Sequence, residues 1–191
     1  GYSPDPAAYF IMYQDITTGR WRCLVRYILQ KVEYALQRET LAWLDRVYGF
    51  DFIGIDMGGV GKVQYQDLAG ELTDYSEYKF LERIFPVEFG GQILVAFDEE
   101  GNEKKDLVKR VAVEMVSRGV HEGRYVFANS DDDLMAELER TKFTRTTTGE
   151  PVYKTENDHQ FAAMMCAVLA YERKFGTPVT LTKREINVKL M

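Results

Sequence analysis

The sequence predicts an α/β domain in which a mixed central β-sheet is flanked by helices. Two segments near the start, 8–15 and 21–31, are rich in aromatic and β-branched residues and are separated by a turn at 17–20, which indicates an antiparallel hairpin. A helical pattern over 34–48 then leads into the short apolar run 51–56, which is typical of a buried parallel strand. A hairpin followed by alternating strands and helices favours a mixed sheet with helices on its faces.

The size and composition fit one globular domain. The chain has 191 residues, of which 46% are hydrophobic and 28% charged, and this excludes a disordered or collagen-like protein. The net charge of −6 argues against a generic basic nucleic-acid binder. It leaves room for a local basic patch or for a metal site lined by carboxylates.

The two cysteines, Cys23 and Cys166, lie inside apolar runs, so we expect buried free thiols and a reducing compartment. No apolar run reaches the length of about 20 residues that a transmembrane helix needs, and the amino terminus does not have the pattern of a signal peptide. We therefore expect no association with a membrane.

Each element follows from a local pattern. The helix over 34–48 has apolar residues at helical spacing and a suitable end in Gly49. The strand 51–56 ends in Asp56, and a glycine-rich loop leads to a helix that begins near Lys62. The later expectations, in order, are a short helix or loop over 76–85, an extended segment over 85–91, a helix over 104–118, a short strand over 124–128, a helix over 131–140, a hairpin around Gly149 and an apolar helix over 159–174. We expect one domain over 1–175 and a carboxy-terminal tail over 176–191.

The strongest candidate for chemistry is Asp56. Ligands of α/β sheets bind beyond the carboxyl ends of strands, and the glycines after Asp56 allow a close approach. The alternative is an Asp that only turns or caps the chain. A phosphate-binding loop is excluded, because Gly61-Lys62 is followed by Val63 and the position of the first glycine of that motif is held by Asp56.

A second candidate is the segment Asn157-Asp158-His159, directly before the apolar helix. Asn and Asp are good helix N-caps, but a carboxylate beside a His can also bind a cation held by an acid at a strand end. His121 lies in a polar turn and is expected to be solvated.

Three further groups are weaker candidates. The run 131–133 consists of three Asp residues and suits the start of a helix better than a cation site. Asp5 lies between two prolines. A modest basic cluster around the late hairpin, formed by Lys142, Arg145 and Lys154, could contact phosphates or could be only a solvated surface.

Four short segments, in this order, resemble the nuclease domain of the bacteriophage terminase large subunit, and the resemblance covers roughly 1–175. The segments are GYSPDPAA at 1–8, IGIDMGGVG at 53–61, FPVEFG at 85–90 and YKTENDH at 153–159. The first resembles the segment that follows the family's first catalytic Asp. The second and fourth resemble the segments that carry its second and third acids.

The resemblance implies an RNase H-like fold of the RuvC and integrase type and a metal-dependent endonuclease that cuts concatemeric double-stranded DNA. It implies two Mg²⁺ or Mn²⁺ ions, with Asp56 and Asp158 as metal ligands and His159 as a neighbouring catalytic residue. It also implies a host-cytoplasmic setting and, in the full protein, an ATPase domain, a portal and a small terminase subunit as partners. The residue types agree, because hard cations prefer carboxylate oxygens and paired ions promote hydrolysis of phosphodiesters.

Two departures from the family pattern leave alternatives open. The chain has no initiator Met and begins at or just after the first acid, so we expect a fragment or processed piece that does not contain the strand carrying that acid. We expect such a piece to bind metal weakly and to cut DNA weakly or not at all. Some family members carry a further acid where this chain has Ala162. A resolvase of the Holliday-junction type is one alternative, and a non-catalytic module that docks on the packaging motor or portal is another.

Overall fold

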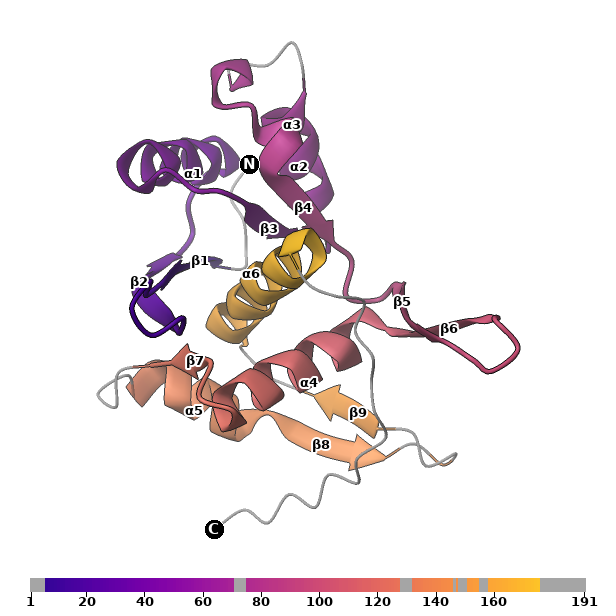
Figure 1. Ribbon diagram of the computed structural model, residues 1–191. Coiled ribbons are helices and arrows are strands. Elements are labelled where there is room, and N and C mark those ends of the chain that lie inside the picture. Colours follow the sequence, from indigo (N-terminus) through magenta and orange to yellow (C-terminus); the bar gives the residue numbers. More distant parts are fainter. Residues whose placement is uncertain are drawn as a thin grey trace.

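Helix α6 (His159–Phe175) is the central element of the fold. It packs against strands β1, β3 and β4 and against helices α4 and α5 (Figure 1). The computed structural model describes residues 6–70, 75–127, 132–145, 147, 151–154 and 158–175. The other residues, which include Asp5, Asp131, Gly149 and the tail 176–191, lie outside the described part, and so do the expectations that concern them.

The amino-terminal hairpin forms as expected. Strands β1 (Ala7–Gln14) and β2 (Trp21–Leu29) pair antiparallel, with a bulge between Ile11 and Met12. In the turn, the carboxylate of Asp15 accepts hydrogen bonds from the N–H groups of Thr17 and Thr18, and these bonds lower its pKa. The short strand β7 (Tyr125–Val126) adds to β2 in the parallel direction, so this sheet is mixed.

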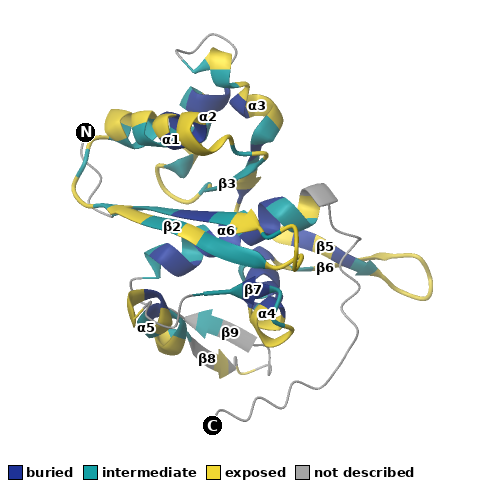
Figure 2. Ribbon diagram, turned by 60° about the vertical axis from the view of Figure 1, so that its left-hand side comes forward, coloured by how far each residue is buried: buried dark blue, intermediate teal, exposed yellow. Residues whose placement is uncertain are grey.

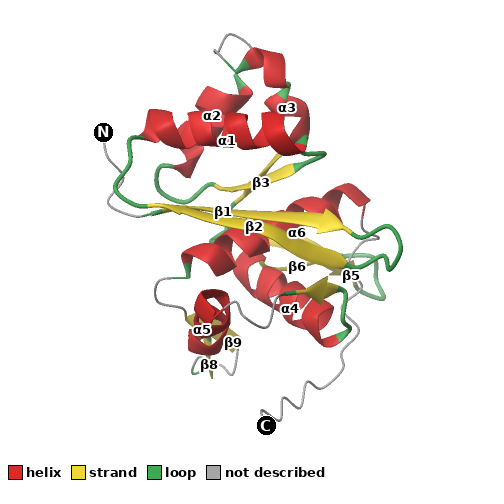
Figure 3. Cartoon of the chain, turned by 90° about the vertical axis from the view of Figure 1, so that its left-hand side faces the viewer, coloured by secondary structure: helices red, strands yellow, loops and turns green. Residues whose placement is uncertain are grey.

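A second, two-stranded sheet lies beside three helices. Helix α1 (Tyr34–Tyr48) ends at Gly49, which adopts the left-handed conformation with φ of 64°. Strand β3 (Ile53–Asp56) is followed by α2 (Gly61–Ala69), by the 3-10 turn η1 (Ser76–Tyr78) and by α3 (Phe80–Arg83). Strand β4 (Ile84–Val87) then pairs with β3 in the parallel direction, as the sequence predicts for 51–56 (Figure 1). Figure 3 shows α1, α2 and α3 on one side of β3.

A small apolar core, the minor cluster, holds these helices on β3 and β4. It consists of Ala42, Leu68, Phe80 and Ile84. Beside it, Arg83 forms a bidentate ion pair with Asp45, with both N···O distances 2.7 Å, and joins α3 to α1. The guanidinium also donates to the carbonyl of Phe50 at 2.6 Å, so it holds the segment that connects the end of α1 to β3.

The prediction of a helix over 104–118 is wrong for its first residues. Residues Glu103–Leu107 form strand β6, which pairs antiparallel with β5 (Gln92–Phe97), and helix α4 covers Val108–His121. The hairpin is stabilised by its turn, in which the carboxylate of Asp98 accepts hydrogen bonds from the N–H groups of Glu100 and Asn102. A strong local turn therefore overrides the helical propensity of the Glu and Lys residues that follow it.

The main core, the major cluster, lies between α4, α6 and helix α5 (Asp132–Arg140) (Figure 2). Its fully buried side chains include Val111, Leu134, Met164 and Leu169. Strands β8 (Lys142–Arg145) and β9 (Pro151–Lys154) form the expected late hairpin, and β9 contacts α4. No helix of the described residues is long and apolar enough to cross a membrane.

The two cysteines differ in burial. Cys166 is buried in the major cluster, Cys23 is partly exposed at its edge, and neither forms a disulfide. Within the described residues the strands form small sheets, among them the mixed sheet β1-β2-β7 and the parallel pair β3-β4. A cavity lies between β1 and β3.

Candidate functional site

Asp56 is the last residue of β3, at the carboxyl end of the strand, and its side chain is exposed. Its Oδ1 accepts a hydrogen bond of 2.8 Å from the N–H of Gly58, which fixes the orientation of the carboxylate. The strand therefore presents an oriented carboxylate at the position where ligands of α/β sheets bind.

Two glycines are required for this arrangement. A Cβ atom at Gly54 would lie 2.0 Å from the carbonyl oxygen of Cys166, so only glycine allows β3 to lie directly on α6. A Cβ atom at Gly61 would lie 1.7 Å from the carbonyl oxygen of Asp56, so only glycine allows α2 to begin beside the strand end. These glycines serve the close approach of the chain's own backbone.

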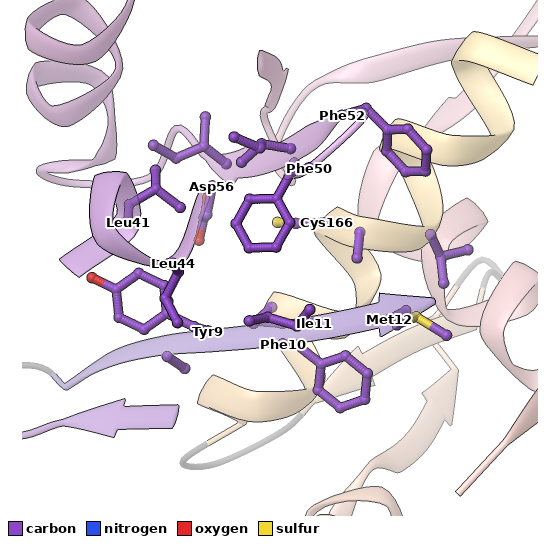
Figure 4. A pocket seen from close by; sticks show the side chains of 18 of the residues that line it. Tyr9, Phe10, Ile11, Met12, Leu41, Leu44, Phe50, Phe52, Asp56 and Cys166 are labelled. Atoms are coloured by element: carbon purple, nitrogen blue, oxygen red, sulfur yellow. The ribbon is translucent and has the colours of Figure 1, made fainter. Parts of the chain in front are cut away.

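The cavity beside Asp56 has a volume of about 1030 Å³ (Figure 4). Strands β1 and β3 and helices α1 and α6 all contribute to its lining. Asp56, at the end of β3, and His159, the first residue of α6, both line it. Beneath Asp56, burial raises the pKa of the Cys166 thiol, and the negative charge of Asp56 raises it further.

Asp158 lies immediately before α6, and its backbone carbonyl accepts a hydrogen bond of 2.7 Å from the N–H of Ala162. Its carboxylate forms an ion pair with Lys109 of α4, with Nζ 3.2 Å from Oδ2. Asp158 is not among the described residues that line the cavity. Its carboxylate is thus held toward α4, whereas the neighbouring His159 faces the cavity with Asp56.

The first turn of α6 is capped by a residue from another helix. The N–H groups of Gln160 and Phe161 both donate to Oε2 of Glu137 in α5, at 3.0 and 2.9 Å. These two donors are the ones that an N-cap side chain usually satisfies. Glu137 therefore takes the capping role that was the alternative for Asp158, and it joins α5 to the start of α6.

The basic residues of the late hairpin are distributed over its two strands. Lys142 of β8 lies opposite Lys154 of β9, and Arg145 lies opposite Pro151. The backbone therefore gathers Lys142 and Lys154 at one end of the hairpin and Arg145 at the other. His121, at the end of α4, is exposed as expected.

A divalent metal would need more oxygen donors than this site provides. Within the described residues no three His, Cys, Asp or Glu side chains are close enough together to hold a metal ion. Asp56 and Asp158 have the right chemistry for Mg²⁺ or Mn²⁺, which take about six oxygen ligands. The described residues therefore do not complete a metal site.

Sequence reasoning missed two residues of this region. Lys109 is separated from Asp158 by 49 positions, and no local pattern reveals that pairing. Glu137 could have been found, because it stands three residues after the buried Leu134 on the same face of its helix. A carboxylate at a core-facing position indicates a buried partner, since an unpaired charge is costly there.

The fold is RNase H-like, with helices on a mixed sheet and a carboxylate at the end of a parallel strand. More narrowly, it is the fold of phage large terminase nuclease domains, which confirms the fold class that the resemblance implied. No known family profile matches the sequence, and no curated protein matches it.

Three solved structures illustrate the likeness. The large terminase nuclease from thermophilic phage G20c is 16% identical, and the alignment covers 91% of this chain and 77% of that chain with a TM-score of 0.54. The same nuclease with bound magnesium gives 18% identity, coverages of 90% and 84%, and a TM-score of 0.55. The g2p large terminase nuclease domain of bacteriophage SPP1, with bound Mn, is 17% identical. The alignment covers 92% of this chain and 82% of that chain with a TM-score of 0.51.

Proposed function

We propose that this chain is a nuclease domain of a phage DNA-packaging terminase and that it cuts concatemeric double-stranded DNA. The observation that carries the proposal is the oriented carboxylate of Asp56 at the end of β3, in a cavity that His159 also lines. The fold is that of large terminase nuclease domains, and related structures contain magnesium or manganese. In the full protein, an ATPase domain, the portal and the small terminase subunit would be partners in the host cytoplasm.

We assign the chain's own residues as follows. Asp56 and Asp158 are the proposed ligands of divalent ions, and His159 is a neighbouring catalytic residue. Because the described residues lack a cluster of three ligands, a second ion and a full coordination shell require further oxygen donors. Lys109 orients the carboxylate of Asp158 through their ion pair.

For DNA, we propose contacts on the β8–β9 hairpin. Lys142, Arg145 and Lys154 belong to its two strands, where positive charges can neutralise phosphates even though the whole chain carries −6. Such contacts position a duplex without reading its sequence. The proposal therefore includes no sequence preference.

The test compares Asp56→Asn with Asp133→Asn, which removes the same charge from an exposed position on α5. We expect the wild-type chain and Asp133→Asn to show the same weak binding of Mn²⁺ in calorimetry and the same slow nicking of supercoiled plasmid, because the described residues supply fewer than three clustered ligands. Asp56→Asn should lose at least about a hundredfold in nicking rate and at least about tenfold in affinity for Mn²⁺.

Each result decides between the hypotheses. Undiminished nicking by Asp56→Asn would refute the assignment of the site. A wild-type chain that neither binds Mn²⁺ nor nicks DNA would favour the non-catalytic docking module, which the incomplete ligand set also favours. A strong preference for four-way junctions over linear duplex would indicate a resolvase.

A further inference from the structure

Helix α1 carries apolar side chains on its outer face. Leu36, Trp43 and Val47 are 46%, 54% and 52% exposed, and they recur along the helix at intervals that place them on one face. Figure 1 shows α1 at the outer edge of the molecule. The inner side of the same helix buries Ala42 and Leu44. A helix that is apolar on its outer as well as its inner side is typical of a buried position, so the outer face indicates a surface that another molecule covers.

The polar residue of this face can be covered without loss. Thr40 lies between Leu36 and Trp43 on the helix surface, and its Oγ1 donates a hydrogen bond of 2.7 Å to the carbonyl of Leu36. Covering the face would therefore leave no unpaired hydroxyl donor, which is the usual cost of burying a threonine. Trp is also among the residue types that most often dominate binding at interfaces. We call this face the α1 stripe, and it consists of Leu36, Thr40, Trp43 and Val47.

One flank of the α1 stripe carries two opposite charges. Glu39 and Arg46 are both exposed, and their spacing of two helical turns places them on the same side of the stripe. The guanidinium of Arg46 lies over the ring of Tyr78, with Cζ 5.8 Å from the ring centre, and donates to the hydroxyl of that tyrosine. This contact holds the positive charge at the edge of the stripe, two turns after the negative charge.

These charges are self-complementary in one direction of helix pairing. The other flank of the stripe carries Gln37 and the buried Leu44, neither of which is charged. In a parallel pair related by a two-fold axis, the charged flank of one copy meets the uncharged flank of the other. In an antiparallel pair each flank meets its own counterpart, so Glu39 of one copy faces Arg46 of the other, and the reverse pair forms by symmetry.

The apolar residues fit the same antiparallel alignment. When Leu36 lies opposite Val47 of the second copy, Thr40 lies opposite Trp43 of that copy, because both pairs are symmetric about the same point of the helix. In this alignment the two charged residues of the flank are offset by two positions, or about 3 Å along the axis, which their long side chains can bridge. The stripe and its flank therefore predict the same partner, direction and register.

We propose that two copies of this chain associate through α1, with their α1 stripes in antiparallel contact and two ion pairs between Glu39 of one copy and Arg46 of the other. A two-fold interface uses one patch twice, so it requires the self-complementarity that this face has. One helix face covers less than the area of about 800 Å² per partner of a standard interface, so the dimer is weak and reversible, with a Kd of about 10–100 µM. The proposal rests on α1 alone and is independent of nuclease activity.

The first test measures sedimentation velocity of the whole chain from about 5 to about 500 µM, a range that brackets the expected Kd. Trp43→Glu places a charge at the centre of the stripe and should raise the Kd at least about tenfold. The matched control is Phe97→Glu, which replaces an aromatic residue that is 61% exposed on β5 and should leave the Kd unchanged. Both positions are exposed, so both variants should keep the melting temperature within about 2 °C of wild type.

The second test exchanges the charges. Glu39→Arg and Arg46→Glu each bring like charges together across the two-fold axis, so each homodimer should weaken at least about threefold. A mixture of the two variants restores both opposite-charge pairs, and it should form a heterodimer at least about tenfold tighter than either homodimer. The double variant Glu39→Arg/Arg46→Glu should regain the wild-type Kd, because the flank is again complementary to itself.

Each outcome decides the proposal. A wild-type chain that stays monomeric up to the highest concentration overturns it. An equal loss of association in Phe97→Glu and Trp43→Glu would place the interface away from α1 and would also overturn it. A mixture of the two charge variants that associates no better than its components excludes the antiparallel arrangement and is a third refutation.

Discussion

The two apolar cores on either side of the cavity are built differently. The major cluster draws on six strands and helices besides α6, namely β1, β4, β5, β7, α4 and α5, and contains buried runs such as 111–113 on α4. Among the described residues, the minor cluster has four buried members, Ala42, Leu68, Phe80 and Ile84, with the Arg83–Asp45 ion pair beside it. A broad core tolerates the loss of one contact better than a small core does. We therefore expect the helices packed on β3 and β4 to unfold more easily than α4 and α6.

The largest expected effect is on the minor cluster. Phe80 is 1% exposed, and Phe80→Ala should lower the free energy of unfolding by about 3–5 kcal/mol. We expect amide exchange to accelerate first in α1, α2 and α3, while α4 stays protected. The control is Leu81→Ala at the adjacent exposed position, which should change stability by less than about 0.5 kcal/mol. Uniform acceleration over α4 as well would mean that both cores unfold as one unit.

A smaller effect is expected at the junction between α5 and α6. Glu137→Ala leaves the N–H groups of Gln160 and Phe161 without their acceptor, which should cost about 1–3 kcal/mol in guanidinium unfolding. Glu137→Gln keeps one carbonyl acceptor and should lose less, and Glu139→Ala on the exposed face of α5 should lose almost nothing. Equal losses for the Ala and Gln variants would argue against capping.

The smallest effect depends on pH. Burial raises the pKa of Glu114 on α4 from its ordinary value of 4.5, and the nearby charge of Asp106 raises it further. The folded state thus holds the proton more tightly, so this residue's contribution to stability is lost as pH rises from 4.5 through the folded-state pKa. Glu114→Gln should therefore raise the melting temperature at pH 7 and leave it nearly unchanged at pH 4. An equal gain in melting temperature at pH 7 and pH 4 would show that the buried charge of Glu114 is not the cause.

Much of the fold could be predicted because its signals are local. The pattern over 34–48 and Gly49 defines α1 to the residue, and the apolar run that ends in Asp56 defines β3 and its end. The start of α4 could not be predicted, because residues 103–107 owe their strand conformation to pairing with β5. Asp56 and Asp158 were found as candidates by their positions after a strand and before a helix. The pairing of Lys109 with Asp158 depends on tertiary packing that one sequence does not reveal, whereas Glu137 carried the signal of a carboxylate on the core-facing side of its helix.

Cys166 gives the close packing at Gly54 a chemical consequence. Its side chain is 2% exposed, and the raised pKa keeps it in the thiol form, which reacts slowly with alkylating reagents. Because the sulfur is this well buried beside β3 and the cavity, reagent reaches it through local opening of this region. The rate of alkylation at Cys166 therefore measures how often this region opens, and the measurement needs no substitution in the protein.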